Sequence, residues 1–71
     1  MQEFDGKKLA IIRKAAGYTQ KALGEAIGTT ERVVQQWEYN TRAPSATLLL
    51  RLMLLLNITA ADLLTEEQKA E

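Results

Sequence analysis

The sequence contains no cysteine and no histidine among its 71 residues. The lack of cysteine excludes disulfide bonds, and the lack of both residue types excludes zinc sites built from their side chains. Catalysis by a histidine base is excluded as well. Aspartate and glutamate are present, but they form no acid/base pattern, and no nucleophile has a base beside it. We therefore expect that the chain is not an enzyme, and the sequence indicates no cofactor and no small-molecule ligand.

Long hydrophobic runs are also absent. The longest apolar stretch covers residues 48–56, is interrupted by Arg51 and is far shorter than the ~20 residues of a transmembrane helix. Residues 1–8 contain no apolar run of the kind found in signal peptides. A chain of this length forms one domain with a small core. We expect a single cytoplasmic domain over residues 1–71, with its core at about 6–65, a short acidic tail at 66–71 and no membrane partner.

An excess of charge of one sign is lacking too, since the formal net charge is zero. The charges are unevenly distributed, however. Residues 1–61 contain eight basic and five acidic residues, which leaves +3, whereas residues 62–71 leave −3. A polyanion responds to local patches of charge rather than to the total. The pattern is therefore compatible with a nucleic-acid partner, and equally with a mixed, solvated surface.

Glycine and proline are few, with four glycines and one proline, and they divide the chain into segments. These segments are rich in helix formers and show no persistent β alternation. We predict an all-α fold of five helices with short links. The predicted helices cover residues 7–16, 19–27, 30–39, 45–56 and 60–64.

Two of the glycines suit a tight turn between the second and third predicted helices. Gly24 provides a small residue where two helices can cross closely, which gives a reason for the ~1 kcal/mol cost of glycine inside a helix. Gly28 tolerates the positive φ of a turn, and Thr19 and Thr30 can cap the helices that follow them. The apolar residues of this stretch have helical spacing and are expected to face the core: Leu23, Ile27, Val34 and Trp37. The sequence therefore predicts a helix-turn-helix from Thr19 to about Tyr39.

Four polar residues of the third predicted helix remain outside once its apolar face is assigned to the core. They are Glu31, Arg32, Gln35 and Gln36. Glutamine can bond adenine bidentately, arginine can bond guanine in the same way, and glutamate can accept from cytosine. An ordinary solvated helix surface contains the same residue types, so this helix alone does not decide between the two. The spacing relative to Gly24 and Gly28 favours a base-reading surface.

Most of the chain, from about residue 7 to residue 64, resembles the Cro/phage-repressor (XRE-type) helix-turn-helix family. The resemblance depends on an ordered set of motifs: Leu9 with Ile12-Arg13, Gly17-Tyr18-Thr19-Gln20, Gly28, Trp37-Glu38, Arg42 with Pro44-Ser45, and a leucine-rich fourth helix ending at Asn57-Ile58-Thr59. It implies a lambda-repressor-like fold that binds double-stranded DNA and regulates transcription.

The resemblance also implies roles for individual residues. The four outward residues of the third helix match base-reading positions. Gln20 matches a residue that contacts a phosphate and braces the third helix, beside a helix N-terminus that itself attracts anions. Arg42 matches a loop along the phosphates, and its charge would release a counterion on binding. The remaining residues with implied phosphate contacts are Lys21, Thr30, Tyr39, Asn40 and Thr41.

Two charged positions have a different interpretation under this resemblance. Arg13 and Glu38 match a pair that forms an internal salt bridge in some members of the family, which implies a structural role for both. Glu31 departs from the family pattern, because a neutral or basic residue is commoner there. Its carboxylate either accepts from a cytosine amino group or serves the helix dipole in the first turn, and both roles stay open.

The fourth predicted helix has more leucine than one buried face requires. The family pattern needs Leu49, Leu52, Met53 and Leu56 for the core, with Ile58 and Leu63 nearby. Outside this set remain Leu48, Leu50, Leu54 and Leu55. An apolar surface of this extent on so small a domain is expected to be covered. We predict a twofold homodimer through the fourth helix, with these four leucines at the interface, together with the fifth helix and the C-terminal tail. In the alternative, the fifth helix, the tail or Phe4 covers them within one chain.

The leading interpretation is a transcriptional regulator, with repression as the preferred mode, that reads a near-palindromic operator as a dimer. The alternative is a protein-interaction module or antitoxin-type domain with the same fold and weak or no DNA binding. The zero net charge and Glu31 keep this alternative open. A salt-dependent shift of duplex DNA distinguishes the two.

Overall fold

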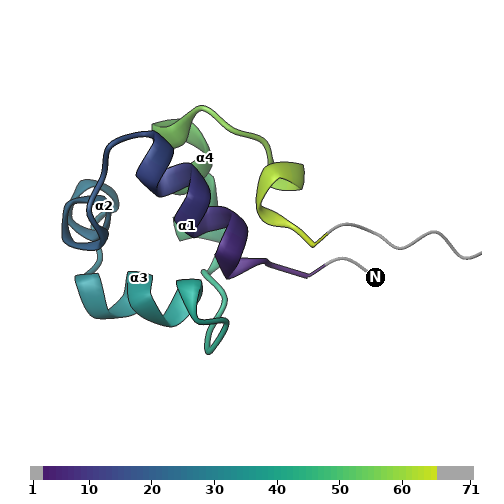
Figure 1. Ribbon diagram of the computed structural model, residues 1–71, viewed down its shortest axis with the longest axis horizontal. Coiled ribbons are helices and arrows are strands. Elements are labelled where there is room, and N and C mark those ends of the chain that lie inside the picture. Colours follow the sequence, from purple (N-terminus) through teal and green to yellow (C-terminus); the bar gives the residue numbers. More distant parts are fainter. Residues whose placement is uncertain (1–2, 66–71) are drawn as a thin grey trace, which may run out of the picture.

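Four α-helices and a short 3₁₀ helix follow one another in the computed structural model, which describes residues 3–65. They are α1 (Gly6–Ala15), α2 (Gln20–Ile27), α3 (Glu31–Glu38), α4 (Ala46–Leu56) and the 3₁₀ helix η1 (Ala60–Leu63). In Figure 1, α1 crosses the middle of the molecule, α2 is seen end-on at one side, and α3 runs below them. Over residues 3–65, no helix has the length and apolarity to span a bilayer. The acidic tail expected at 66–71 lies outside the described residues.

The starts and ends of the helices are set by local polar caps and glycines. The hydroxyls of Thr19, Thr30 and Ser45 accept from the amide of the third residue of α2, α3 and α4, at 3.0, 3.3 and 3.3 Å. Each bond satisfies a first-turn N–H that has no partner within its own helix. Gly17 and Gly28 adopt φ values of 86° and 88° after α1 and α2. The caps and the turn conformation of Gly28 predicted from the sequence are therefore confirmed.

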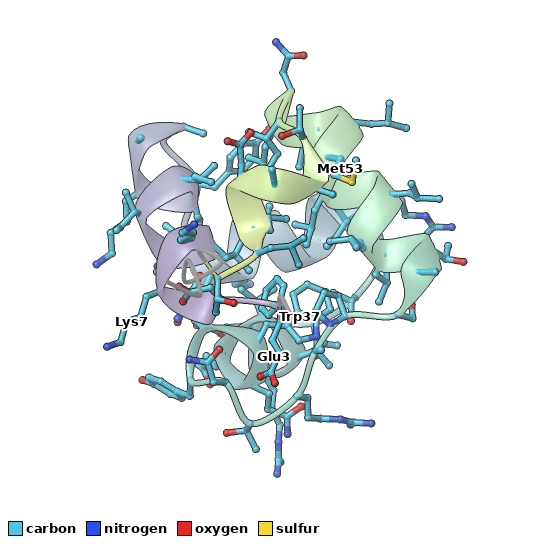
Figure 2. The ribbon with its side chains drawn as sticks, turned by 90° about the vertical axis from the view of Figure 1, so that its right-hand side faces the viewer. Glu3, Lys7, Trp37 and Met53 are labelled. Atoms are coloured by element: carbon cyan, nitrogen blue, oxygen red, sulfur yellow. The ribbon has the colours of Figure 1, made fainter. Side chains whose placement is uncertain are left out.

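Every helix contributes at least one side chain to a single hydrophobic core. Figure 2 shows Trp37 in the interior, where it is only 2% exposed, while Lys7 points outward. Burying an aromatic or aliphatic side chain of this size contributes about 1.5–3 kcal/mol. The four residues of the helix-turn-helix predicted to face the core do so. The buried apolar residues are Leu9, Leu23, Ile27, Val34, Trp37, Leu52 and Leu63.

The face of α4 that packs against the core differs from the predicted one, since it includes Leu48 and Leu55 and leaves out Met53. Leu52 is fully buried, and Leu49, Leu56 and Ile58 are half-buried against the core, as expected. Met53 is half-buried but lies outside the hydrophobic cluster. It stands one position from Leu52, which is about 100° around the helix, and so lies at the edge of the side that meets the core.

The prediction of a fifth α-helix over residues 60–64 is wrong, because this segment forms η1 and then becomes extended. Asp62 N donates to the carbonyl of Thr59, three residues back, at 3.1 Å, and the Asp62 carboxylate accepts from Thr59 N at 2.9 Å. A segment of four residues is too short for a ladder of α-helical bonds and suits the tighter 3₁₀ turn. Leu64 leaves the helix to form an antiparallel bridge with Phe4.

Gly6, the first residue of α1, is buried against the end of α3. A Cβ at this position would lie 2.1 Å from the carbonyl oxygen of Trp37 and 2.8 Å from the Cα of Glu38. Only glycine allows this close approach of two backbones. The contact fixes α1 directly over the last turn of α3.

Candidate nucleic-acid interface

The turn between α2 and α3 is closed around Gly24. A Cβ on Gly24 would lie 2.7 Å from the carbonyl carbon of Thr30, so the predicted need for a small residue at this crossing is confirmed. Thr29 N donates to the carbonyl of Gly24 at 2.8 Å, and Gly28 provides the left-handed residue between the helices. These local contacts hold α3 at a fixed angle to α2.

One side of α3 faces the core and the other faces outward. Val34 and Trp37 are buried, whereas Glu31 and Arg32 are exposed and Gln35 and Gln36 are half-buried. Among residues 3–65, the side chains of Glu31, Arg32 and Gln36 have no hydrogen-bond or ion-pair partner. The outer side of α3 is therefore available to a ligand.

Gln35 differs from its neighbours because a polar network reaches it from the interior. Arg13 donates through Nε and Nη2 to the two carboxylate oxygens of Glu38, at 2.5 and 3.1 Å, and both side chains are less than one-tenth exposed. The Nε2 of Gln20 donates to Glu38 Oε1 at 2.9 Å, and the Nε2 of Gln35 donates to Gln20 Oε1 at 3.3 Å. The network connects α1, the end of α3, the start of α2 and the outer side of α3.

The order of donors and acceptors in this network fixes the orientation of both amides. An ionised carboxylate only accepts, so Gln20 must turn its NH₂ group to Glu38 and its carbonyl oxygen to Gln35. Gln35 must then direct its own NH₂ group to Gln20. Its carbonyl oxygen and second N–H have no partner within residues 3–65. These are one acceptor and one donor, the pair that can bond the major-groove edge of adenine.

The chain that follows α3 forms an exposed loop with one internal anchor. Tyr39 is 75% exposed, and Thr41 and Arg42 are exposed as well. Asn40 has φ 61°, and its side-chain oxygen accepts from Gly6 N at 2.8 Å. The Asn40 side chain therefore caps the start of α1 from a distance of 34 residues in the sequence. Sequence reasoning missed this contact because no local pattern indicates it.

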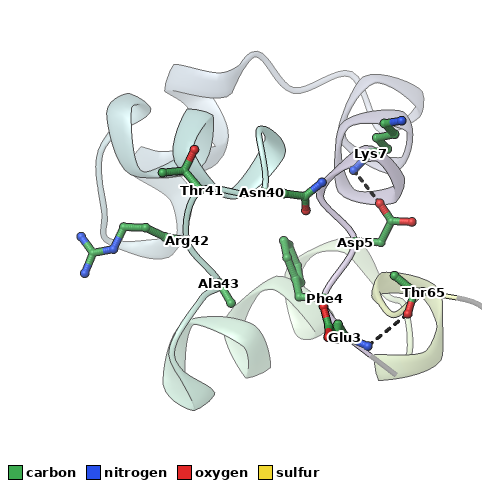
Figure 3. A pocket seen from close by; sticks show the side chains of 9 residues that line it. All are labelled: Glu3, Phe4, Asp5, Lys7, Asn40, Thr41, Arg42, Ala43 and Thr65. Atoms are coloured by element: carbon green, nitrogen blue, oxygen red, sulfur yellow. Dashed lines mark hydrogen bonds between the residues drawn. The ribbon is translucent and has the colours of Figure 1, made fainter. Parts of the chain in front are cut away.

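A cavity of about 670 Å³ lies between this loop and the N-terminal segment (Figure 3). The Phe4 side chain extends from the N-terminal segment toward the loop, and the Arg42 side chain extends away from the cavity. The loop expected along the phosphates thus forms one wall of the cavity. The lining residues are Glu3, Phe4, Asp5, Lys7, Asn40, Thr41, Arg42, Ala43 and Thr65.

Three further residues with expected phosphate contacts lie at the starts of α2 and α3. Lys21 and Thr30 are exposed, and Gln20 is half-buried. The Thr30 oxygen caps α3, which leaves its hydroxyl hydrogen available as a donor. Gln20 uses one of its two amide hydrogens on Glu38. All three residues keep at least one donor that has no partner within residues 3–65.

The four leucines expected at a dimer interface do not share one environment. Leu50 and Leu54 are 58% and 82% exposed, one helical turn apart on α4. Leu48 and Leu55 are half-buried and pack against the core of the same chain. The uncovered apolar surface of α4 is therefore centred on Leu50 and Leu54.

The fold and the turn have counterparts among solved structures. The P22 c2 repressor in complex with synthetic operator 9T matches with a TM-score of 0.75 at 28% identity, over 80% of this chain and 86% of that chain. The restriction-modification controller protein C.AhdI from Aeromonas hydrophila matches with a TM-score of 0.73 at 28% identity, over 80% of this chain and 86% of that chain. The biofilm regulator SinR in complex with DNA matches with a TM-score of 0.73 at 24% identity, over 80% of this chain and 95% of that chain. At this level of identity the match supports the fold alone. The lambda-repressor-like fold is thereby confirmed.

Sequence comparison gives the family. A helix-turn-helix family model (HTH_3) matches residues 9–63, which is most of the chain. The uncharacterized HTH-type transcriptional regulator YazB of Bacillus subtilis (strain 168) is 32% identical over 66 residues, which cover 93% of this chain and 96% of YazB. These matches assign the chain to regulators rather than to enzymes. With its α2–α3 turn built around Gly24 and Gly28, the chain belongs to the XRE/Cro-C1-type helix-turn-helix family of DNA-binding transcriptional regulators.

Proposed function

We propose that the chain represses transcription by binding a near-palindromic DNA operator as a homodimer, with α3 reading bases in the major groove. The observation that carries the proposal is the polar network from the buried Arg13–Glu38 pair through Gln20 to Gln35. It holds a donor and an acceptor in fixed order on the outer side of α3. Fixed polar groups of this kind are what discrimination between bases requires.

The outward residues of α3 differ in what they can recognise. Gln35 suits adenine through its free oxygen and N–H, and the exposed Arg32 suits the two acceptors of guanine. Gln36 provides a second amide one position further along. Glu31 stands in the first turn of α3, where its carboxylate is favoured by the helix dipole. It either stays there or accepts from a cytosine amino group, and base selection distinguishes these roles.

Phosphate contacts would surround this reading surface on two sides. One side is the N-terminus of α2 with Gln20, Lys21 and the adjoining Thr30. The other is the loop from Tyr39 to Arg42, which is exposed. Cations and helix N-termini are the usual phosphate partners. The likeness to a repressor bound to its operator supports this arrangement. A regulator that binds chromosomal DNA acts where the DNA lies, so the proposed place of action is the cytoplasm.

The homodimer is supported by the uncovered leucines of α4. A second copy on Leu50 and Leu54 would remove two large apolar side chains from water, at about 25 cal/mol per Å² of apolar area. The outer parts of Leu48 and Leu55 would add to this contact. Twofold symmetry would present two α3 helices to half-sites about 34–36 Å apart, one turn of DNA.

The proposal is tested by a pair of variants that separates the two kinds of contact. Arg42→Ala is expected to weaken binding to operator and random duplex alike and to reduce the slope of log K against log salt by about 0.9. Gln35→Ala is expected to leave that slope unchanged and to lower discrimination at one base position, by about 1–3 kcal/mol. Identical effects of the two variants on specific and random DNA would refute these roles. If the wild type produces no salt-dependent shift of duplex DNA, the protein-interaction alternative is favoured.

A further inference from the structure

Arg51 reaches from α4 to the turn of the helix-turn-helix. Its Nη1 donates to the carbonyl oxygen of Ile27 at 2.9 Å, across 24 residues of sequence. Ile27 is the last residue of α2, and the final carbonyls of a helix have no partner within it. A Cβ on Gly28 would lie 3.0 Å from the same nitrogen. The guanidinium therefore lies directly against the turn residue with positive φ.

The turn itself does not satisfy this carbonyl. Gly28 N bonds to the carbonyls of Gly24 and Glu25, and Thr29 N bonds again to that of Gly24. These local bonds close the end of α2 but leave the Ile27 oxygen to a group from outside the motif. The last turn of α2 also contains no basic residue. Arg51 supplies both the hydrogen bond and the positive charge that a helix C-terminus favours.

We propose that Arg51 is a positioning residue for recognition: it holds the α2–α3 turn from α4 and so fixes the orientation of α3, without contacting DNA. The inference rests on the proposed function, in that it assumes base reading by α3. The first outward residue, Glu31, follows Gly28 by only three positions. A small rotation at the turn would displace all base-reading side chains together. Binding sites tolerate only about 0.5 Å or 10–20° of such displacement.

The test uses Arg51→Met, which keeps most of the aliphatic stem and removes the donors and the charge. Affinity for a selected operator is expected to fall about tenfold, the effect of losing one hydrogen bond to a charged group. Affinity for random duplex and the salt slope are expected to stay unchanged. A phosphate contact would instead lower both affinities and reduce the slope by about 0.9. Arg51→Lys, which keeps the cation, is expected to recover part of the loss.

Lys14→Met is the matched control, because Lys14 is an exposed cation in the last turn of α1 that makes no side-chain bond within residues 3–65. This variant removes one positive charge. It should change neither the ratio of the affinities for operator and random DNA nor the conformation of the α2–α3 turn. Hydrogen exchange provides a readout that needs no DNA. The amides of Gly28 and Thr29 are expected to exchange about tenfold faster in Arg51→Met than in Lys14→Met.

Three outcomes decide the proposal. A loss confined to operator DNA, with faster exchange at the turn, supports it. An equal loss on all DNA with a reduced slope overturns it in favour of a phosphate contact, and unchanged operator affinity and exchange overturn it outright. If the wild type does not bind DNA, the proposed function fails, and the exchange rates at Gly28 and Thr29 still decide whether Arg51 holds the turn.

Discussion

The Arg13–Glu38 pair gives the sharpest prediction about stability. Replacing Arg13 with methionine keeps most of the stem but removes both donors from the Glu38 carboxylate. Glu38 is 5% exposed in its side chain and would retain only the amide of Gln20. Arg13 also donates to the carbonyl of Tyr18 at 2.9 Å, and this bond is lost as well. The substitution therefore leaves a buried charge with one neutral donor.

The expected cost is large relative to the stability of so small a domain. Removing one partner of a buried ion pair costs about 3–5 kcal/mol. A chain of this length has a total stability of about 4–11 kcal/mol, from 0.05–0.15 kcal/mol per residue. Arg13→Met is therefore expected to lower Tm by at least about 12 °C, since each kcal/mol shifts a domain of this size by about 4–8 °C.

Urea unfolding followed by tryptophan fluorescence measures this directly, because Trp37 is the only tryptophan and is buried. Two-state analysis should give a lower midpoint with an unchanged m-value. The double variant Arg13→Met with Glu38→Gln removes both charges and is expected to be more stable than Arg13→Met alone. A loss below about 1 kcal/mol for Arg13→Met would contradict a buried ion pair, because that is the value of a solvated surface pair.

Three further predictions concern packing, capping and assembly. Gly6→Ala is expected to cost at least about 2 kcal/mol of stability because the added Cβ would meet backbone atoms of α3. Gly17→Ala is expected to cost only about 1–2 kcal/mol, because its φ of 86° is strained but its surroundings are open. Urea midpoints compare the two variants, and an equal cost would contradict the close contact of Gly6 with α3. Thr19→Ala is expected to lose about 1 kcal/mol by removing the α2 cap, which a thermal melt detects. Leu54→Asp is expected to convert the dimer into a folded monomer, measured by sedimentation at micromolar concentration. The control Ile11→Asp, at a 67% exposed site on α1, is expected to stay dimeric. A monomeric wild type would contradict the dimer.

Features that depend on local chemistry could be predicted from the sequence. Thr19 and Thr30 cap the helices that directly follow them, and Gly28 takes the positive φ that the turn needs. Helical spacing was enough to assign Val34 and Trp37 to the core and their polar neighbours to the outside. The conformation of each of these residues is determined mainly by its neighbours in sequence.

Features that depend on distant partners could not be predicted. Gly6 resembles an ordinary chain break, and only the packed structure shows that it lies against the last turn of α3. Asn40 and Arg51 are polar surface residues in sequence terms, yet they cap the start of α1 and the end of α2. The chain after η1 is held by the bridge between Leu64 and Phe4, 60 positions apart. Periodicity within a segment contains no information about such contacts.

Selection of bound fragments from a pool of random duplex DNA tests whether a dimer of this chain reads bases through α3. We expect enrichment of two inverted half-sites with centres about 10–10.5 base pairs apart, and loss of preference at one position of each half-site for Gln35→Ala. Binding should weaken steeply as salt rises. Recovery of unrelated fragments without a shared half-site, or of single half-sites with no fixed spacing, would contradict a dimer that reads DNA through α3.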